Sequence, residues 1–314
     1  MSSLNRRRFL GAAIGTGAAA AAAGTWTPGA SAQSGGSAAG GRRTVPNNRI
    51  AIQLYTLREI MTDRRSVRRV LNQLGAMGYT EVEMAGHYDL TAPQLRGLLD
   101  DAGLRPVSGH DGFPIVADDS WKGPYQEALD YAAELGQKYT GLAHFGGPYD
   151  EARFQRVAEQ LEEAGEMAQS AGLQFFYHNH DFEFSNKQAD GTPLFDILLA
   201  TNRDRVKFQL DLYWIIEGGE NPLAYLSADP ARYMGYHVKD RTWKPRPDGA
   251  PNWEDAGPGS LDFPDMFAAG LGRPRTDKHY IIEHDDPFLS HPGDPDAPLK
   301  TAQTGVEFLR NVRF

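Results

Sequence analysis

The chain of 314 residues contains no cysteine, which excludes disulfide bonds, thiolate nucleophiles and Cys-ligated zinc. Any metal site must therefore be built from His, Asp and Glu side chains. Basic residues are also scarce relative to acidic ones, 32 against 41, so that the formal net charge is −9. This balance argues against binding to a nucleic-acid backbone or to an anionic membrane surface, because both require a cationic footprint. The charged and hydrophobic fractions, 23% and 40%, are typical of a globular protein with one or two domains.

A long hydrophobic run is missing as well, and the segment that comes nearest to one is the Ala/Gly stretch at 11–24. It is too short and too weakly apolar for a stable membrane span. Residues 6–10 read RRRFL, the twin-arginine form RRxFL, and residues 30–32 read ASA, an A-x-A cleavage site. We therefore predict that residues 1–32 are a signal peptide for the twin-arginine export machinery, cleaved near Ala32, which makes the mature protein periplasmic or secreted. Residues 33–48, rich in Gly and Ser, indicate a flexible linker.

From residue 49 onwards, short β-branched or aromatic segments alternate with amphipathic helical patterns. We predict strands at 50–55, 79–84, 105–110, 139–145, 173–178, 206–211, 233–238 and 279–283. Helical spacing of apolar residues is clearest at 66–77, 91–102 and 151–171, each followed by a glycine at or next to its end. Eight such strands predict an α/β fold, a closed (β/α)₈ TIM barrel, as a single catalytic domain over 49–314. An open doubly wound sheet is the alternative, but it would normally show a Gly-rich phosphate turn after its first strand.

Polar residues gather where these strands end, which in a TIM barrel is the face that carries function. They are Gln53, Tyr55, Glu83, His110, His144, His178, Asn179, His180, Asp211, His237, Lys239, Glu283 and His284. Each of them alone has a plain alternative as a structural histidine or a charge on the rim. The set as a whole predicts an active site.

Four of these residues end four successive strands and can converge near the barrel axis: His178, Asp211, His237 and Glu283. Two imidazoles and two carboxylates predict a site for a divalent ion. Such a donor set suits Mn²⁺, Co²⁺, Fe²⁺ or Zn²⁺ better than Ca²⁺, which prefers oxygen alone.

Six motifs together resemble the sugar phosphate isomerase/epimerase family, which has a xylose isomerase-like TIM barrel. The motifs are QLYTLR at 53–58, YHNHDFEF at 177–184, QLDLYW at 209–214, YHVKD at 236–240, GPGSLDF at 257–263 and IEHD at 282–285. The resemblance covers about 49–314, and YHNHDFEF is specific to one branch of the family.

This resemblance implies a divalent metal held by Glu, Asp, His and Glu at the ends of strands five to eight. Asp211, His237 and Glu283 match the last three ligands, whereas His178 stands where the family has its first glutamate. The two ligand glutamates also serve as the acid/base pair in epimerases of the family, and of that pair this chain retains only Glu283. A second base would have to come from His110, His144, His180, Lys239 or Glu83, or Glu183 would replace the missing carboxylate.

The mechanism that these residues predict begins with a carbonyl and a neighbouring hydroxyl, both chelated by the metal. The metal acidifies the adjacent C–H and stabilises an enediolate, while Glu283 or a histidine removes the proton. Lys239 holds a substrate oxygen, or else is a rim lysine paired with Asp240. His110 and His180 are further catalytic candidates. The predicted substrate contacts are Gln53, Tyr55, Glu83, His144, Trp214 and Trp243.

The predicted activity is therefore that of a metal-dependent isomerase or epimerase acting on a free sugar or keto-sugar, since an exported protein meets few sugar phosphates. Elimination from the same enediolate makes a keto-glycoside lyase or hydratase the alternative. A non-catalytic carbohydrate-binding barrel is a further one, for which sugar affinity would not change with a chelator. The abasic-site endonucleases of this superfamily need a basic surface, which a mature chain with 29 basic and 41 acidic residues lacks. The sequence leaves the oligomeric state open.

Overall fold

The computed structural model describes residues 43–244, 246–247, 249–271 and 278–314. The predicted signal peptide and most of the predicted linker lie outside the described residues. No helix within the described ranges is long and apolar enough to cross a membrane.

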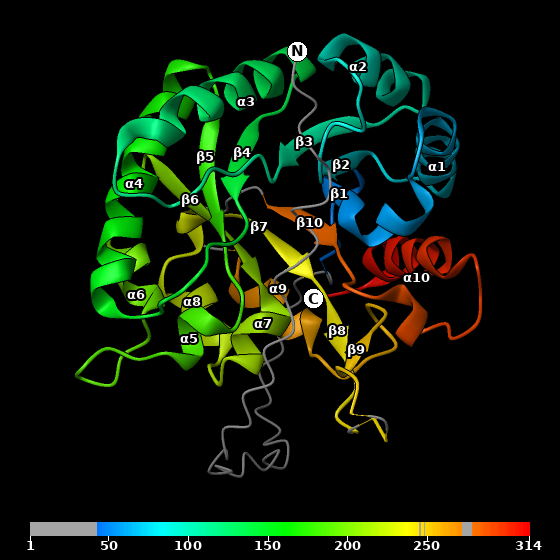
Figure 1. The fold of residues 1–314 in the computed structure, drawn as a ribbon. Coiled ribbons are helices and arrows are strands. Elements are labelled where there is room, and N and C mark those ends of the chain that lie inside the picture. The colour runs from blue at the N-terminus through cyan, green and yellow to red at the C-terminus, as the bar shows by residue number, and fades with distance from the viewer. Residues whose placement is uncertain (1–42, 245, 248, 272–277) are drawn as a thin grey trace. The chain divides into compact units, whose positions relative to one another are not determined.

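Eight parallel strands close into a barrel in the order β1-β10-β7-β6-β5-β4-β3-β2 (Figure 1). The strands are β1 (Ile50–Gln53), β2 (Glu81–Met84), β3 (Arg105–Gly109), β4 (Tyr139–Leu142), β5 (Gln174–His178), β6 (Val206–Asp211), β7 (Tyr233–Val238) and β10 (His279–Ile282). β1 pairs with both β2 and β10, which closes the sheet. The predicted (β/α)₈ fold is confirmed.

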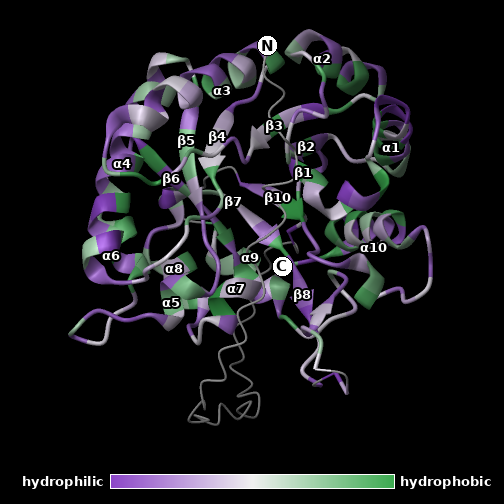
Figure 2. Cartoon of the chain, in the orientation of Figure 1, coloured by the Kyte–Doolittle hydropathy of each residue, from purple (hydrophilic) through white to green (hydrophobic). Residues whose placement is uncertain are grey.

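Helices surround the strands and bury one face against them. They are α1 (Arg64–Met77), α2 (Ala92–Asp101), α3 (Lys122–Leu135), α4 (Glu151–Ser170), α5 (Phe182–Ser185), α6 (Phe195–Leu199), α7 (Leu212–Glu217), α8 (Pro222–Ala228), α9 (Phe263–Ala269) and α10 (Ala297–Asn311). The ribbons of α1 and α10 alternate between hydrophobic and hydrophilic residues, as expected for helices with one buried face (Figure 2). Capping boxes at Asp63 and Thr91 begin α1 and α2, and Gly78, with φ of 97°, ends α1.

Three departures from the predicted elements occur at the functional face. The fourth strand ends at Leu142 and not at Phe145, so that His144 lies in the loop that follows. The first strand ends at Gln53 and not at Tyr55, because Leu54–Ile60 forms a 3₁₀ helix that the Gln53 side chain caps at its start. Beyond β7, an antiparallel pair of short strands, β8 (Asp240–Arg241) and β9 (Trp253–Glu254), extends the loop before α9. Neither the 3₁₀ helix nor the strand pair has the length or periodicity that sequence patterns detect.

The registers of neighbouring strands bring the predicted site residues level with one another. Gln53 pairs with Glu83, and Asp211 pairs with His237. His178 lies beside Gln209 on β6. The polar layer therefore lies at the carboxyl ends of the strands, where the barrel opens.

Candidate metal centre

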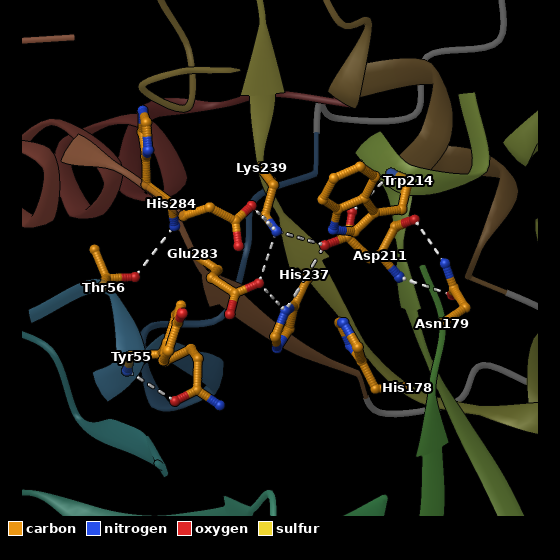
Figure 3. Close-up of polar contacts among 12 residues, drawn as sticks. Tyr55, Thr56, His178, Asn179, Asp211, Trp214, His237, Lys239, Glu283 and His284 are labelled. Atoms are coloured by element: carbon orange, nitrogen blue, oxygen red, sulfur yellow. Dashed lines mark hydrogen bonds and ion pairs between the residues drawn. The ribbon is translucent and has the colours of Figure 1, made fainter. Parts of the chain in front are cut away.

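Four side chains at the ends of β5, β6, β7 and β10 converge at one point (Figure 3). His178, Asp211, His237 and Glu283 each offer one ligand atom, and these atoms all lie within 4.8 Å of one another. All four residues are buried. The convergence predicted from strand order is thus present in the fold, because parallel strands of a barrel point their carboxyl ends at the same opening.

Two members of this cluster have one polar atom held by the scaffold and a second atom left for a ligand. The Nδ1 atom of His178 lies 2.9 Å from the amide oxygen of Gln209, which leaves its Nε2. The Oδ1 atom of Asp211 accepts the backbone N–H of Trp214 at 2.9 Å and caps α7. The other oxygen of Asp211, Oδ2, is buried and accepts no hydrogen bond, and its contact is an ion pair with Lys239.

The other two members face each other. His237 Nε2 lies 2.6 Å from a carboxylate oxygen of Glu83, beneath the cluster. His237 Nδ1 lies 2.8 Å from Glu283 Oε2 and 3.9 Å from Asp211 Oδ2. The imidazole therefore spans two carboxylates, one below the cluster and one within it.

A buried ammonium group borders the cluster. Lys239 Nζ lies 3.2 Å from Asp211 Oδ2, 3.0 Å from Glu283 Oε2 and 2.6 Å from Asp285 Oδ2. Asp240 has a different role, since its carboxylate accepts backbone N–H groups of Gly257, Ser260 and Leu261. The pairing of Lys239 with Asp240 is therefore not the one that forms.

Burial and neighbouring charges lower the pKa of one histidine of the cluster and raise the pKa of the other. Burial, reinforced by the neighbouring His237, lowers the pKa of His178 well below its usual range, which keeps this ring neutral. Burial also lowers the pKa of His237, but Glu283 and Glu83 outweigh it and raise the value to about 10. Burial raises the pKa of Asp211 to about 6, although Lys239 and His237 oppose the rise.

These observations fit a divalent cation. The donor set is two imidazole nitrogens and two carboxylates, and the buried Asp211 Oδ2 accepts no hydrogen bond, although Lys239 Nζ lies 3.2 Å from it as an ion pair. Negative charge is in excess, because Asp211, Glu283 and Asp285 surround the ammonium group of Lys239 and Glu83 lies against His237, so that four carboxylates face two basic groups. A dication would offset that excess and permit His237 to be neutral.

A second group, His110, His178 and His237, also brings three nitrogens within 4.8 Å. His110 Nδ1 faces the amide nitrogen of Gln53 at 3.4 Å, so it accepts and Nε2 carries the hydrogen. That N–H points at Gln209 Oε1 at 3.1 Å and at Glu83 Oε1 at 3.2 Å. His110 therefore belongs to a hydrogen-bond network beneath the centre, and the four-residue group is the better metal site.

The predicted substrate contacts occupy three different surroundings. Gln53 and Glu83 are buried beneath the centre, where the Gln53 amide donates to Glu83 at 2.8 Å. Tyr55 and Trp243 are 42% and 52% exposed, each below an arginine that stacks on its ring, Arg58 and Arg241 respectively. Trp214 lies between these levels, with its ring 5.2 Å from Lys239 Nζ.

Of the other histidines predicted at the strand ends, His180 and His144 lie beside the cluster and His284 does not. The ring of His180 lies 5.0 Å from that of His178 and 5.4 Å from that of His144, and its Nδ1 is buried without a partner. Burial lowers the pKa of both His180 and His144, so both are neutral. His284 turns away and lies 2.9 Å from the hydroxyl of Ser290.

Glu183 does not join the metal cluster. Its carboxylate accepts the Tyr177 hydroxyl at 2.6 Å and the His180 backbone N–H at 2.9 Å, and it is fully buried. It fixes the turn after β5 rather than supplying the carboxylate that His178 lacks.

The burial of Glu183 predicts a pH-dependent stability. Burial raises its pKa from 4.5 to about 8, although the hydrogen bonds from Tyr177 and His180 oppose the shift. The folded protein therefore holds a proton that the unfolded chain releases, and the stabilisation present below about pH 4.5 is lost as the pH rises through 8. We expect the Tm of Glu183→Gln to fall less than that of the wild type between pH 5 and pH 8.5. Equal slopes for the two proteins, measured by circular dichroism, would contradict this.

Three residues support the site in roles that the sequence analysis did not assign: Asn179 was named only as a polar residue at a strand end, and Gln209 and Asp285 only as parts of family motifs. The Asn179 side chain contacts both the backbone N–H of Asp211, at 3.1 Å, and its carbonyl, at 3.3 Å. Gln209 lies beneath His178, and Asp285 holds Lys239. Of Gln209 and Asp285, Gln209 had a usable signal, because it precedes Asp211 by two residues and a strand presents such residues on one face.

The model of the family described as the xylose isomerase-like TIM barrel matches residues 71–312. The chain belongs to this family. The resemblance inferred from the six motifs is thereby confirmed.

Three relatives illustrate the range of this xylose isomerase-like barrel family. The inosose dehydratase of Lacticaseibacillus casei is 24% identical over 195 residues, which are 55% of this chain and 62% of that protein. A sugar phosphate isomerase/epimerase from Parabacteroides distasonis ATCC 8503 has a TM-score of 0.66 at 24% identity, covering 88% of this chain and 96% of its own. The zinc-bound IolI protein has a TM-score of 0.66 at 16% identity, covering 85% of this chain and 99% of its own. The two structures share the fold of this barrel.

Proposed function

We propose that this barrel is a divalent-metal-dependent isomerase or epimerase of a free sugar or keto-sugar. The observation that carries the proposal is the contact of a carboxylate and an ammonium group at the edge of the four-residue cluster, where Glu283 Oε2 and Lys239 Nζ lie 3.0 Å apart. A base can remove a proton from the carbon next to a carbonyl group, and a hydrogen-bond donor can stabilise the charge that develops on the carbonyl oxygen. The bound ion supplies the positive charge that polarises the carbonyl and acidifies the neighbouring C–H.

The chain's own residues then have distinct roles. His178, Asp211, His237 and Glu283 hold the ion. Glu283 removes the proton from carbon, and Lys239 donates a hydrogen bond to the oxygen on which negative charge develops. Asp285, at 2.6 Å, keeps the ammonium group of Lys239 in place.

Elimination is the second candidate activity, and His178 favours it. The cluster contains carboxylates only on the β6 and β10 sides, because β5 presents an imidazole. An epimerase that uses two carboxylates on opposite faces has no match for the second one here, whereas removing one proton and expelling a neighbouring substituent needs only one such base. The similarity to an inosose dehydratase supports this alternative.

Proton exchange with D₂O tests the proposal and separates its two forms. The protein is loaded with Mn²⁺, Co²⁺ or Zn²⁺, and keto-sugars and glycosides are followed by NMR. Deuterium that enters one carbon of an intact sugar indicates isomerisation or epimerisation, and loss of a substituent indicates a lyase or hydratase. We expect Lys239→Met to slow either reaction by about 10²–10⁴-fold, the usual contribution of one acid or base. Sugar binding without turnover, unchanged by a chelator, would overturn the proposal in favour of a binding protein.

Export is part of the proposal, since it places the protein among free sugars. Replacing Arg6 and Arg7 by lysine preserves the charge of the RRRFL motif but removes the paired guanidinium groups that the export machinery reads. We expect the full-length precursor to accumulate in the cytoplasm, detected by immunoblots of cell fractions. Arg42→Lys with Arg43→Lys is the matched control and should be exported normally. Unchanged delivery of the Arg6/Arg7 double variant would contradict the assignment.

A further inference from the structure

We propose that Glu83 and Gln209 form a positioning pair beneath the metal centre, and that this pair selects which nitrogen of His178 and of His237 faces the ion. The inference rests on the proposed function only in that the four-residue cluster binds a divalent ion. It gives Glu83 a role in holding ligands instead of contacting substrate.

Glu83 is the centre of the network. Its carboxylate is fully buried and has five polar neighbours, namely Gln53 Nε2 at 2.8 Å, His237 Nε2 at 2.6 Å, His110 Nε2 at 3.2 Å, Ser108 Oγ at 2.6 Å and Gln209 Nε2 at 2.5 Å. An ionised carboxylate only accepts hydrogen bonds, so every one of these neighbours must donate. His237 therefore carries a hydrogen on Nε2 and, when neutral, has its lone pair on Nδ1. That nitrogen is the one which faces Glu283 and Asp211.

Gln209 transmits the same constraint to His178. Because its amide nitrogen donates to Glu83, its amide oxygen is turned towards His178 Nδ1 at 2.9 Å. An amide oxygen can only accept, so His178 carries its hydrogen on Nδ1 and has its lone pair on Nε2. The two imidazoles thus face the ion through different nitrogens, Nε2 for His178 and Nδ1 for His237.

The consequence concerns the strength of the site. A neutral imidazole binds a metal through only one nitrogen, and the partner of the other nitrogen decides the tautomer and the ring orientation. One buried carboxylate does this for His237 directly and for His178 through a single amide group. His178 on β5, which stands where the resemblance to the family implies a carboxylate, is therefore oriented by Gln209 on β6.

A measurement on the unaltered protein tests the pairing directly. In the Zn²⁺-loaded protein with ¹⁵N-labelled histidine, long-range ¹H–¹⁵N spectra report which ring nitrogen is metal-bound and which carries hydrogen. We expect His178 to bind through Nε2 and His237 through Nδ1. Binding of either ring through the opposite nitrogen would overturn the inference. If neither ring shows a metal-bound nitrogen, the proposed metal centre itself fails.

Substitutions test whether the pair matters for affinity. Gln209→Met removes the hydrogen bond to His178 and keeps a side chain of similar size. In Glu83→Gln the new amide can donate an N–H to Gln209, and the Gln209 amide then rotates so that its own N–H faces His178 Nδ1. His178 Nδ1 must then accept, so the ring carries its hydrogen on Nε2, the nitrogen that the ion needs. We expect both variants to bind Co²⁺ about 10–100-fold more weakly than the wild type by calorimetry, the usual cost of losing such a partner.

Glu81→Gln is the matched control. Glu81 lies on the same strand, is equally buried and pairs with His279 Nδ1 at 2.6 Å, but at the opposite end of β2 from the centre. It should lower stability as Glu83→Gln does and leave Co²⁺ affinity within about twofold of the wild type. If Gln209→Met and Glu83→Gln bind Co²⁺ as tightly as Glu81→Gln, the pair is only structural and the inference is wrong. Should a variant fail to fold, by circular dichroism, the NMR measurement on the wild type still decides.

Discussion

Asp211→Asn and Glu283→Gln are each expected to weaken divalent-ion binding by more than about 100-fold, since even the loss of an outer partner costs about 10–100-fold. Each change removes a negative charge from the cluster but retains the shape of the side chain. Asn at position 211 can still accept the Trp214 N–H that begins α7, so the far-UV circular dichroism should remain native. Metal content after equilibrium dialysis, measured by plasma spectrometry, checks this expectation.

Asp255→Asn provides the comparison for these variants. Asp255 is also buried and contacts an imidazole, that of His291 at 2.7 Å, but it lies outside the four-residue cluster. We expect this variant to retain the metal content of the wild type. Full occupancy in both Asp211→Asn and Glu283→Gln would remove the cluster from consideration as a metal site.

Metal binding should also depend on pH in a defined direction. Without an ion, Glu283 and Glu83 raise the pKa of His237 to about 10 against the effect of burial, so the ring is protonated at neutral pH. An ion that binds Nδ1 must displace that proton, so the affinity should rise by up to about tenfold per pH unit between pH 6.5 and pH 9. Calorimetry in buffers of different ionisation enthalpy should show about one proton released per ion bound. A pH-independent affinity would contradict the role of His237 as a ligand.

Lys239→Met is expected to destabilise the ion-free protein by about 3–5 kcal/mol, the usual cost of leaving a buried charge without its partner. The ammonium group is the common neighbour of Asp211, Glu283 and Asp285, and their negative charges raise its pKa well above the usual range although burial opposes this. Two of these carboxylates are proposed ligands. Added Co²⁺ should therefore restore stability to Lys239→Met, and it should stabilise this variant more than it stabilises the wild type.

Lys278→Met separates this effect from the general cost of removing a buried lysine. Lys278 is also buried, but its ammonium group donates to the backbone carbonyls of Tyr233 and Pro230. Denaturant unfolding with and without Co²⁺ should show the same gain for Lys278→Met as for the wild type. If Co²⁺ stabilises both lysine variants equally, the charge balance proposed for the metal centre is wrong.

The barrel and the location of its candidate site could be predicted from the sequence because both depend on local patterns. Strand and helix differ in the period of their apolar residues, and eight alternations of the two leave few ways to bury every strand. Parallel strands share one carboxyl end, so Asp211 and His237 had to lie at the same face once the strands were recognised. The family motifs added the expectation of a metal, and the departure at His178 was visible in the letters alone.

The partners of the site residues were decided only by the closed barrel. Gln53 and Glu83 were predicted to contact substrate. Closure of the barrel instead brings Glu83 on β2 against His237 on β7, with β1 and β10 between the two strands, and places the Gln53 amide against Glu83 beneath the centre. Lys239 had Asp240 next to it in sequence but pairs with Asp285, which follows the strand adjacent to its own. These choices follow from distances between residues remote in the chain and from the rule that a buried donor or acceptor must find a partner. No periodicity in a single segment encodes such distances, because barrel closure alone sets which strand ends meet.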